Sequence, residues 1–134
     1  MTSPTWARVE SLTRHEPAFV APHVPLRMVS EQMWARSVGT MLVGSPDRLL
    51  GIVSERDIVA ALARGADPDV ATAAGVMTTD IVSVRIGDTL YDAAVDMLDV
   101  GIRHVPVVDD HGAVTGVVSV RDLLRPLLVE ALGG

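Results

Sequence analysis

The sequence of 134 residues contains neither cysteine nor lysine, and each absence excludes a kind of chemistry. Without cysteine the chain can form no disulfide, no thiol nucleophile and no thiolate metal site. All eleven basic residues are arginines. A Schiff-base lysine and the lysine of a phosphate-binding P-loop are therefore excluded as well.

Aromatic residues and long apolar runs are also scarce. Aromatic side chains make up 3% of the sequence although 49% of it is hydrophobic, so aliphatic residues and methionine must fill the core. No apolar run approaches the roughly 20 residues that a transmembrane helix needs, and the first ten residues lack the pattern of a signal peptide. We therefore expect a soluble, cytoplasmic protein without a membrane partner. The net charge of −6 argues against nucleic acid as a partner, because nucleic-acid binding needs a cationic surface.

A nine-residue stretch occurs twice at a fixed separation. Gly51–Val59 reads GIVSERDIV, and Gly116–Leu124, sixty-five residues further along, reads GVVSVRDLL. Both copies hold glycine, two β-branched residues, serine, arginine, aspartate and two aliphatic residues at the same positions. The chain is therefore predicted to consist of two repeated units that share a core, since one unit alone cannot cover both faces of a small sheet.

Hydrophobic patterning predicts the same order of elements in both repeats: strand, helix, strand, strand, helix. The fold class is thus α/β, or α+β in some schemes. In the first repeat we expect strands at 18–21, 40–43 and 49–53 and helices from Pro25 and Ser54. In the second we expect strands at 81–84, 104–108 and 114–118, a helix capped by Asp88 or Thr89, and a last helix from Ser119.

The same patterns divide the chain into four segments. They are an N-terminal tail (1–7), a first repeat (8–66), a linker (67–75) and a second repeat (76–132). Residues 69–76 are rich in alanine and are predicted to form a short helix or a turn.

Each copy of the nine-residue stretch places serine and aspartate three residues apart at a predicted helix start. In the first copy Ser54 and Asp57 fit a capping box, in which the two side chains satisfy free amides of the first turn. Arg56 does not fit a purely structural role, because the helix dipole disfavours a cation in the first turn. An arginine beside free amides and a hydroxyl suits an anion such as phosphate, whereas an ion pair of Arg56 with Glu55 or Asp57 is the structural alternative. The second copy repeats this arrangement with Ser119, Arg121 and Asp122.

Tandem β-α-β-β-α units that end in Gly-aliphatic-aliphatic-Ser-x-x-Asp resemble the cystathionine-β-synthase (CBS) domain pair, or Bateman module. Besides the repeated stretch, Val76–Asp80 (VMTTD) and Gly101–Asp109 (GIRHVPVVD) carry the resemblance, which covers roughly residues 8–132. It implies an intramolecular pair with a pseudo-two-fold axis that forms a disc-like homodimer through its helices. It also implies regulatory clefts for adenosine-containing ligands, namely AMP, ADP, ATP, S-adenosylmethionine or NAD, with no required cofactor.

The resemblance assigns roles to particular residues. It implies that Asp57 and Asp122 hold ribose hydroxyls. Residues on the phosphate side are Ser54, Arg56, Thr40, Ser119, Arg121, Arg103 and His104. Residues around the base are Ile52 and Val117, with Ala18, Phe19 and Val20 beside the Asp122 pocket and Thr79, Asp80 and Ile81 beside the Asp57 pocket.

The two repeats differ where the middle strand begins. The second repeat has Arg103-His104 there and Pro106 further on, where the first has Gly39-Thr40 and Leu42. His104 either faces phosphate or is a hydrogen-bonded, partly buried histidine. The extra cations suggest that the Asp122 pocket binds the more anionic ligand and the Asp57 pocket binds weakly or not at all.

The sequence is consistent with two classes of function and disfavours a third. The first is a regulatory module that senses an adenine nucleotide and signals to an unidentified partner protein. The second is a structural dimerisation module with vestigial clefts, for which Trp34 is the first candidate on the dimer face. An enzyme is disfavoured, because no nucleophile, metal-ligand spacing or acid–base pair stands out, so no catalytic residue and no metal ligand is assigned.

Overall fold

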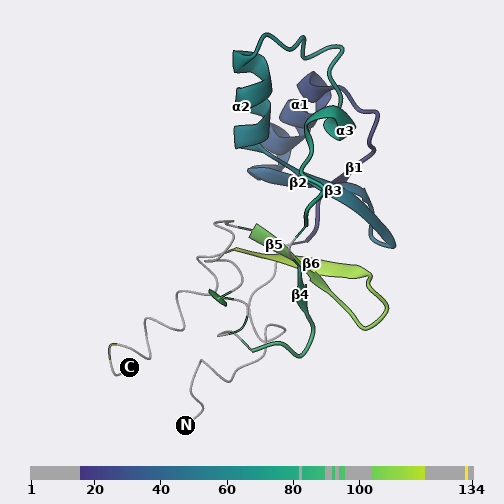
Figure 1. Cartoon of the computed structure of the whole chain (residues 1–134), viewed down its shortest axis with the longest axis vertical. Helices are drawn as coiled ribbons and strands as arrows, with labels where there is room; N and C mark the ends of the chain where they lie inside the picture. Colours follow the sequence, from purple (N-terminus) through teal and green to yellow (C-terminus); the bar gives the residue numbers. More distant parts are fainter. Residues whose placement is uncertain are drawn as a thin grey trace. The chain divides into compact units, whose positions relative to one another are not determined.

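The computed structural model describes residues 16–81, 83–89, 92, 94–95, 104–119 and 132. The chain divides into two compact units, which are described separately (Figure 1). The first unit comprises residues 18–81, and the second comprises residues 1–17 and 82–134. The elements of the first unit are β1 (Phe19–Val20), α1 (Leu26–Arg36), β2 (Thr40–Ser45), β3 (Arg48–Ser54), α2 (Glu55–Ala63) and α3 (Ala73–Val76). Those described in the second are β4 (Val84–Arg85), β5 (His104–Val108) and β6 (Val114–Ser119).

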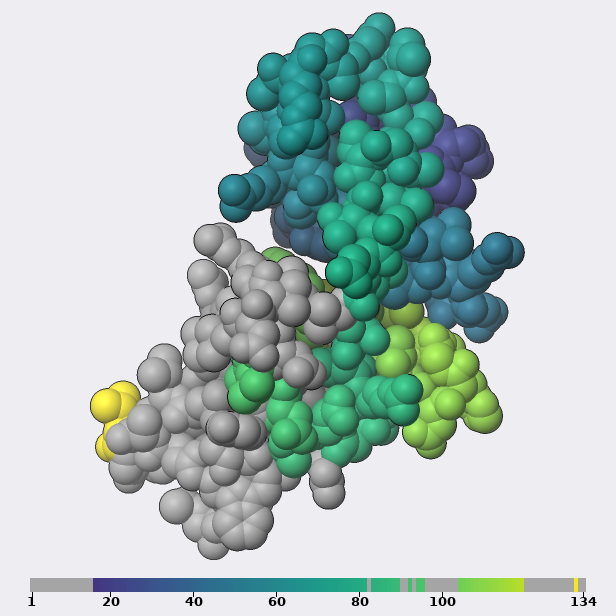
Figure 2. All heavy atoms as spheres, in the orientation of Figure 1, coloured from purple at the N-terminus to yellow at the C-terminus, as the bar shows by residue number. Residues whose placement is uncertain are grey.

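The first unit is built on a three-stranded sheet in the order β1-β2-β3. β1 runs parallel to β2, and β2 and β3 form an antiparallel hairpin. The pairing shifts between Val43 and Gly44, where Gly44 has a φ of 120° that favours glycine. Figure 2 shows the tip of this hairpin protruding from the first unit.

The helices of the first unit cover one face of this sheet and form its core. The predicted stripe of Leu26, Val29 and Met33 on α1 is confirmed, since all three side chains are buried. They pack in one cluster with the buried side chains of β2, β3 and α2, among them Met41 and Val53, which are fully buried. Aliphatic side chains and methionine therefore fill this core, as the low aromatic content requires.

The segment that follows α2 packs onto the first unit. The Leu26 amide donates to the Ala71 carbonyl at 2.9 Å, and the Ala73 amide donates to the Val24 carbonyl at 2.9 Å. The guanidinium of Arg27 on α1 also pairs with the Asp69 carboxylate, which raises the pKa of Arg27 and lowers that of Asp69. The predicted short helix in this segment is α3, and Thr72 caps it. Residues expected to link the repeats thus complete the surface of the first unit.

The second unit repeats the sheet in the order β4-β5-β6, with the same strand directions. His104 pairs with Ser119 as Thr40 pairs with Ser54, and Pro106 pairs with Val117 as Leu42 pairs with Ile52. The predicted equivalence of Thr40 with His104 and of Leu42 with Pro106 is therefore confirmed.

Two details of the second unit refine the sequence-based expectations. The strand expected at 81–84 is instead Val84–Arg85, because these residues pair with Val107 and Val108. Of the two candidate helix caps, Thr89 accepts a hydrogen bond from the Asp92 amide at 3.2 Å, whereas Asp88 accepts one from the Arg85 amide at 2.9 Å.

The helix expected from Ser119 lies outside the described residues. Within the described part of the chain, no helix has the length and apolar character needed to cross a membrane.

Candidate functional site

The junction between β3 and α2 gathers the functional candidates of the first unit. Ser54 is the last residue of β3 and the N-cap of α2. The Asp57 amide donates to Ser54 Oγ at 3.2 Å, and the Ser54 amide donates to Asp57 Oδ2 at 2.8 Å. The capping box expected from the Ser-x-x-Asp spacing is therefore formed, and it holds both side chains at the end of the strand.

The cap engages only one oxygen of the Asp57 carboxylate. Ser54 Oγ also donates to Oδ2, at 3.0 Å, whereas Oδ1 has no hydrogen-bond partner among the described residues. A half-buried carboxylate oxygen without a donor can accept a hydrogen bond from a ligand hydroxyl. The cap therefore leaves one oxygen of the Asp57 carboxylate able to accept a further hydrogen bond.

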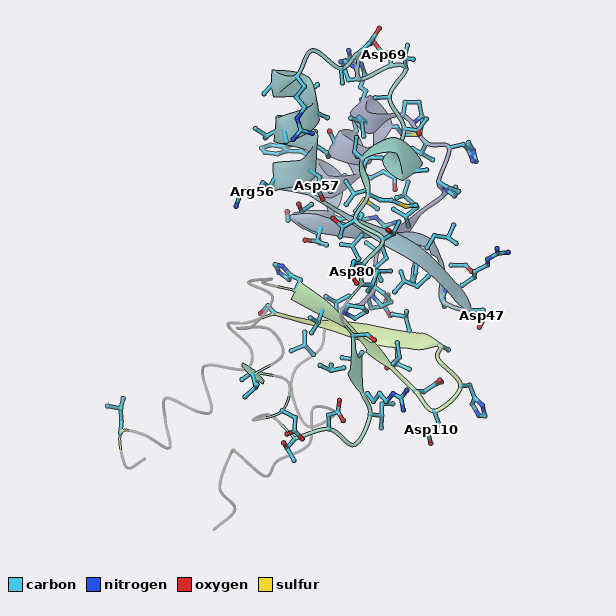
Figure 3. All side chains as sticks on the ribbon, in the orientation of Figure 1. Asp47, Arg56, Asp57, Asp69, Asp80 and Asp110 are labelled. Carbon is cyan, nitrogen blue, oxygen red and sulfur yellow. The ribbon has the colours of Figure 1, made fainter. Side chains whose placement is uncertain are left out.

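Arg56 lies beside this carboxylate and is exposed. Its guanidinium forms no ion pair with any residue in the described ranges, so the alternative of a pair with Glu55 or Asp57 is not observed. Figure 3 shows the Arg56 side chain extending away from α2, while Asp57 lies at the same end of the helix. Because the helix dipole disfavours this cation, a bound anion would remove an electrostatic penalty.

Thr40 and Ile52 lie on the same face of the sheet as Ser54. Thr40 pairs directly with Ser54, and Ile52 lies two residues before it on β3. Side chains alternate along a strand, and Met41 and Val53 point into the helical core. Thr40, Ile52 and Ser54 therefore share the opposite face, which the helices of this unit do not cover.

The three residues expected around the base from β1 and its approach do not share one face. The side chains of Ala18 and Val20 belong to the core of the first unit and are 8% and 4% exposed. Phe19 lies between them, pairs with Leu42 and is half-buried on the other face. Of these three, only Phe19 presents its side chain on the face of Thr40 and Ile52.

Residues 79–81 follow directly from a backbone bridge to β3. The Thr78 amide donates to the Ile52 carbonyl at 2.9 Å, and the Ile52 amide donates to the Thr78 carbonyl at 3.0 Å. A Cβ on Gly51 would lie 2.5 Å from Met77 Sδ and 3.0 Å from the Thr78 carbonyl oxygen, so this approach requires glycine. Thr79, Asp80 and Ile81 are thereby placed just beyond Ile52, within the unit that contains Asp57 (Figure 3).

The sequence predicts no binding role for Glu55, only an ion pair with Arg56 as the structural alternative, and the structure places this residue beside the entry to β2. Its amide donates to the Gly39 carbonyl at 3.0 Å. Its carboxylate carbon lies 3.2 Å from the position of a Cβ on Gly39. A comparison of the two repeats marks this position as different, because Glu55 corresponds to Val120 in an otherwise similar stretch.

The second unit shows the same register for its described candidates. His104 and Ser119 pair at the end of the β5–β6 hairpin, and Val117 lies on the same face two residues before Ser119. Val105 and Val118 alternate with them and are fully buried. Arg103, Arg121 and Asp122 lie outside the described residues.

These features define a class of protein before any relative is considered. Each unit carries a small three-stranded sheet whose hairpin ends at a serine, and the first unit adds hydrogen-bonding and charged groups at a helix start. The described residues contain no group of three or more histidine, aspartate or glutamate side chains that could hold a metal ion. The arrangement is that of two repeated β-sheet units, the first with a capped helix start at the end of its hairpin.

The chain belongs to the CBS domain family. The family description "CBS domain" matches two segments, residues 9–64 and 73–129. The chain is 38% identical over 111 residues to an uncharacterized 17.7 kDa protein of Acidianus ambivalens, covering 81% of this chain and 66% of that protein. It is 32% identical over 115 residues to hypoxic response protein 1 of Mycobacterium tuberculosis, covering 84% of this chain and 80% of that protein.

The fold of this chain matches that of a solved member of the family. The CBS domain protein PAE2072 from Pyrobaculum aerophilum, complexed with AMP, superposes with a TM-score of 0.84 at 31% identity. The match covers 96% of this chain and 100% of that chain. The fold class expected from the sequence is thus confirmed as that of tandem CBS domains.

Proposed function

We propose that this chain is a regulatory module that binds an adenosine-containing nucleotide and signals its presence to a partner protein. The observation that carries this proposal is the β3–α2 junction. There the Arg56 guanidinium, which has no ion-pair partner among the described residues, lies next to Asp57, whose Oδ1 accepts no hydrogen bond from them. Together these groups offer an acceptor for a sugar hydroxyl and a cation for a phosphate. The role proposed is regulatory rather than catalytic.

The family relation supports an adenosine ligand in particular. The Pyrobaculum aerophilum relative was solved in complex with AMP, and it aligns over nearly the whole of this chain. We infer two clefts, one per repeat, with repeats at 8–66 and 76–132. In the first, Asp57 faces ribose, Ser54, Arg56 and Thr40 face phosphate, and Ile52 and residues 79–81 surround the base. In the second, these roles fall to Asp122, to Ser119, Arg121, Arg103 and His104, and to Val117.

A thermal-shift panel tests the proposal directly. We expect at least one of AMP, ADP, ATP, S-adenosylmethionine and NAD to raise the melting temperature of the full chain. At a ligand concentration 100 times Kd, the added stability should be about 2.7 kcal/mol. Guanosine monophosphate serves as the matched control for phosphate and ribose without the adenine base. A flat panel would contradict the proposal and favour a structural dimerisation module with vestigial clefts.

We further propose that the chain forms a homodimer through α1 and α2. The side chain of Trp34 is 87% exposed, and Val59 on α2 is 64% exposed. Both line a hollow between the two helices. Large exposed apolar side chains that gather around one hollow are typical of a protein–protein interface.

Removing the Trp34 side chain should weaken this dimer without unfolding the chain. We expect Trp34→Ala to raise the dimer dissociation constant at least tenfold in sedimentation equilibrium, because buried tryptophans dominate interface energetics. Met28→Ala is the control, since Met28 is exposed on α1 but does not line the hollow. A wild-type chain that stays monomeric at high concentration, or a Trp34→Ala variant with unchanged dimer affinity, would contradict the proposal.

A further inference from the structure

The Ser54 hydroxyl uses its hydrogen within the capping box. A hydroxyl has one hydrogen to donate, and an ionised carboxylate has none. Ser54 Oγ lies 3.0 Å from Asp57 Oδ2, so the serine must be the donor in this contact. The same Oγ accepts a hydrogen bond from the Asp57 amide at 3.2 Å. Ser54 is therefore left without a hydrogen for the oxygen of an ionised phosphate, which can only accept.

Both hydrogen bonds that Asp57 Oδ2 accepts come from Ser54. The Ser54 amide donates at 2.8 Å, and the Ser54 hydroxyl donates at 3.0 Å. Two donors on one carboxylate oxygen fix the rotation of the carboxylate, and Oδ1 accepts no hydrogen bond from the residues that the structure describes. Ser54 therefore acts on a ligand at Oδ1 through the orientation of the Asp57 side chain.

Thr40 offers a second hydroxyl on the same face of the sheet. Thr40 pairs with Ser54 across the β2–β3 hairpin, and the Ser54 amide donates to Asp57 instead of to β2. The two residues thus form a non-hydrogen-bonded pair, in which side chains lie closer together than in the alternate pairs. Thr40 is half-buried, and its hydroxyl forms no hydrogen bond within the described part of the chain. Its hydrogen is available to an acceptor beside the Ser54–Asp57 pair.

We infer that Ser54 is a positioning residue that orients Asp57 toward the ribose, and that Thr40 supplies the hydroxyl that contacts the phosphate. This inference rests on the proposed function and refines it, because it moves Ser54 from the phosphate side of the first-unit site to the ribose side. The two hydroxyls at the end of the hairpin then serve different parts of one ligand. Removing each of them should weaken the binding of different ligands.

The test uses three ligands on the full chain carrying Asp122→Ala, which removes the proposed ribose acceptor of the second repeat. They are AMP, adenosine, which lacks the phosphate, and 2′,3′-dideoxyadenosine, which also lacks the two ring hydroxyls of the ribose. NMR titrations measure each Kd, since they detect weak binding, and the amide signals of Gly51 and Ile52 report on the first-unit site.

Ser54→Ala should weaken the ligands that have ribose hydroxyls. We expect the Kd values for AMP and for adenosine to rise by the same factor, about three- to tenfold, as for the loss of one hydrogen bond. The Kd for 2′,3′-dideoxyadenosine should stay within about twofold, because this ligand has no ring hydroxyl for Asp57 to accept.

Thr40→Val should give the complementary result. Valine keeps the branched shape of threonine and removes the hydroxyl. We expect the Kd for AMP to rise about three- to tenfold, because a hydrogen bond to a charged phosphate is lost. The Kd values for adenosine and 2′,3′-dideoxyadenosine should stay within about twofold, since neither ligand has a phosphate.

Two further variants separate positioning from a merely structural effect. Ser54→Thr keeps a hydroxyl at the N-cap and should bind all three ligands within about twofold of the Asp122→Ala chain. Thr72→Ala removes the hydroxyl that caps α3 in the same unit, and should lower the melting temperature without changing any Kd. A loss of binding caused only by a weakened helix cap would affect 2′,3′-dideoxyadenosine as much as adenosine.

The outcomes distinguish this inference from the proposed function. If Ser54→Ala weakens AMP but not adenosine, Ser54 contacts the phosphate directly, so the positioning role is overturned and the nucleotide site stands. Equal weakening of all three ligands, or no change in any Kd, overturns it as well, and an unchanged Kd for AMP in Thr40→Val overturns the role of Thr40. If no ligand binds the Asp122→Ala chain, both this inference and an adenosine site in the first unit are overturned.

Discussion

Replacing Gly51 with alanine is expected to destabilise the chain by about 1–3 kcal/mol, the usual cost of overpacking a well-packed region. The new Cβ would lie 2.5 Å from Met77 Sδ, 2.8 Å from Met77 Cγ and 3.0 Å from the Thr78 carbonyl oxygen. The Met77 side chain can move, but the Thr78 carbonyl is backbone and accepts the hydrogen bond from Ile52. The substitution should therefore lower the urea midpoint and loosen the bridge that places Thr79–Ile81.

A double-variant cycle identifies the cause of this effect. Gly51→Ala with Met77→Ala should recover part of the loss expected from adding the two single effects, because the smaller side chain removes the closest clash. Gly75→Ala is the matched control, since a Cβ there meets only Thr72 Oγ1 at 3.6 Å and should be tolerated. A Gly51→Ala chain with wild-type stability would show that the close approach to Met77 and Thr78 costs nothing.

The second large effect expected is an unequal loss of nucleotide binding on removal of the two aspartates. Asp122→Ala should raise the Kd for AMP tenfold or more, since hydrogen bonds to a charged group each contribute about 1.5–3 kcal/mol. Asp57→Ala should change the Kd for AMP less than threefold, because the first repeat has Gly39-Thr40 where Arg103-His104 adds cations in the second. Isothermal titration calorimetry of both variants measures the difference.

The cap that Asp57 forms requires its own control. Asp57→Ala removes the acceptor of the Ser54 amide and should lower the free energy of unfolding by about 1 kcal/mol. The titrations should therefore be made well below the melting temperature of this variant. Asp57→Asn keeps an acceptor oxygen and removes the charge. Equal losses of AMP affinity in Asp57→Ala and Asp122→Ala would refute the asymmetry between the repeats.

Local patterns predicted much of what the structure shows. The repeated stretch, the helix stripe of Leu26, Val29 and Met33, and the Ser54–Asp57 capping box depend on residues that are close in sequence. Spacing alone therefore determines which of their side chains can meet. The alignment of Gly39-Thr40 with Arg103-His104 also followed from the sequence, because both hairpins pair outward from the same repeated stretch, and the registers confirm it for Thr40 and His104. The roles of Arg103, Arg121 and Asp122 remain predictions.

Only the tertiary structure decided the features that depend on distant residues. The length of β1 and the phase of its alternation come from its pairing with β2, which directs Ala18 and Val20 into the core and leaves Phe19 on the other face. The charge of Arg56 is visible in the sequence, but the absence of an ion pair with its neighbours is a matter of side-chain geometry. Likewise, no local pattern places the Glu55 carboxylate over Gly39, because that contact exists only once the entry to β2 and the start of α2 are brought together by the sheet. The sequence by itself determined the repeat, the element types and the cap, whereas the fold decided which face of the sheet each side chain occupies and which charged groups pair.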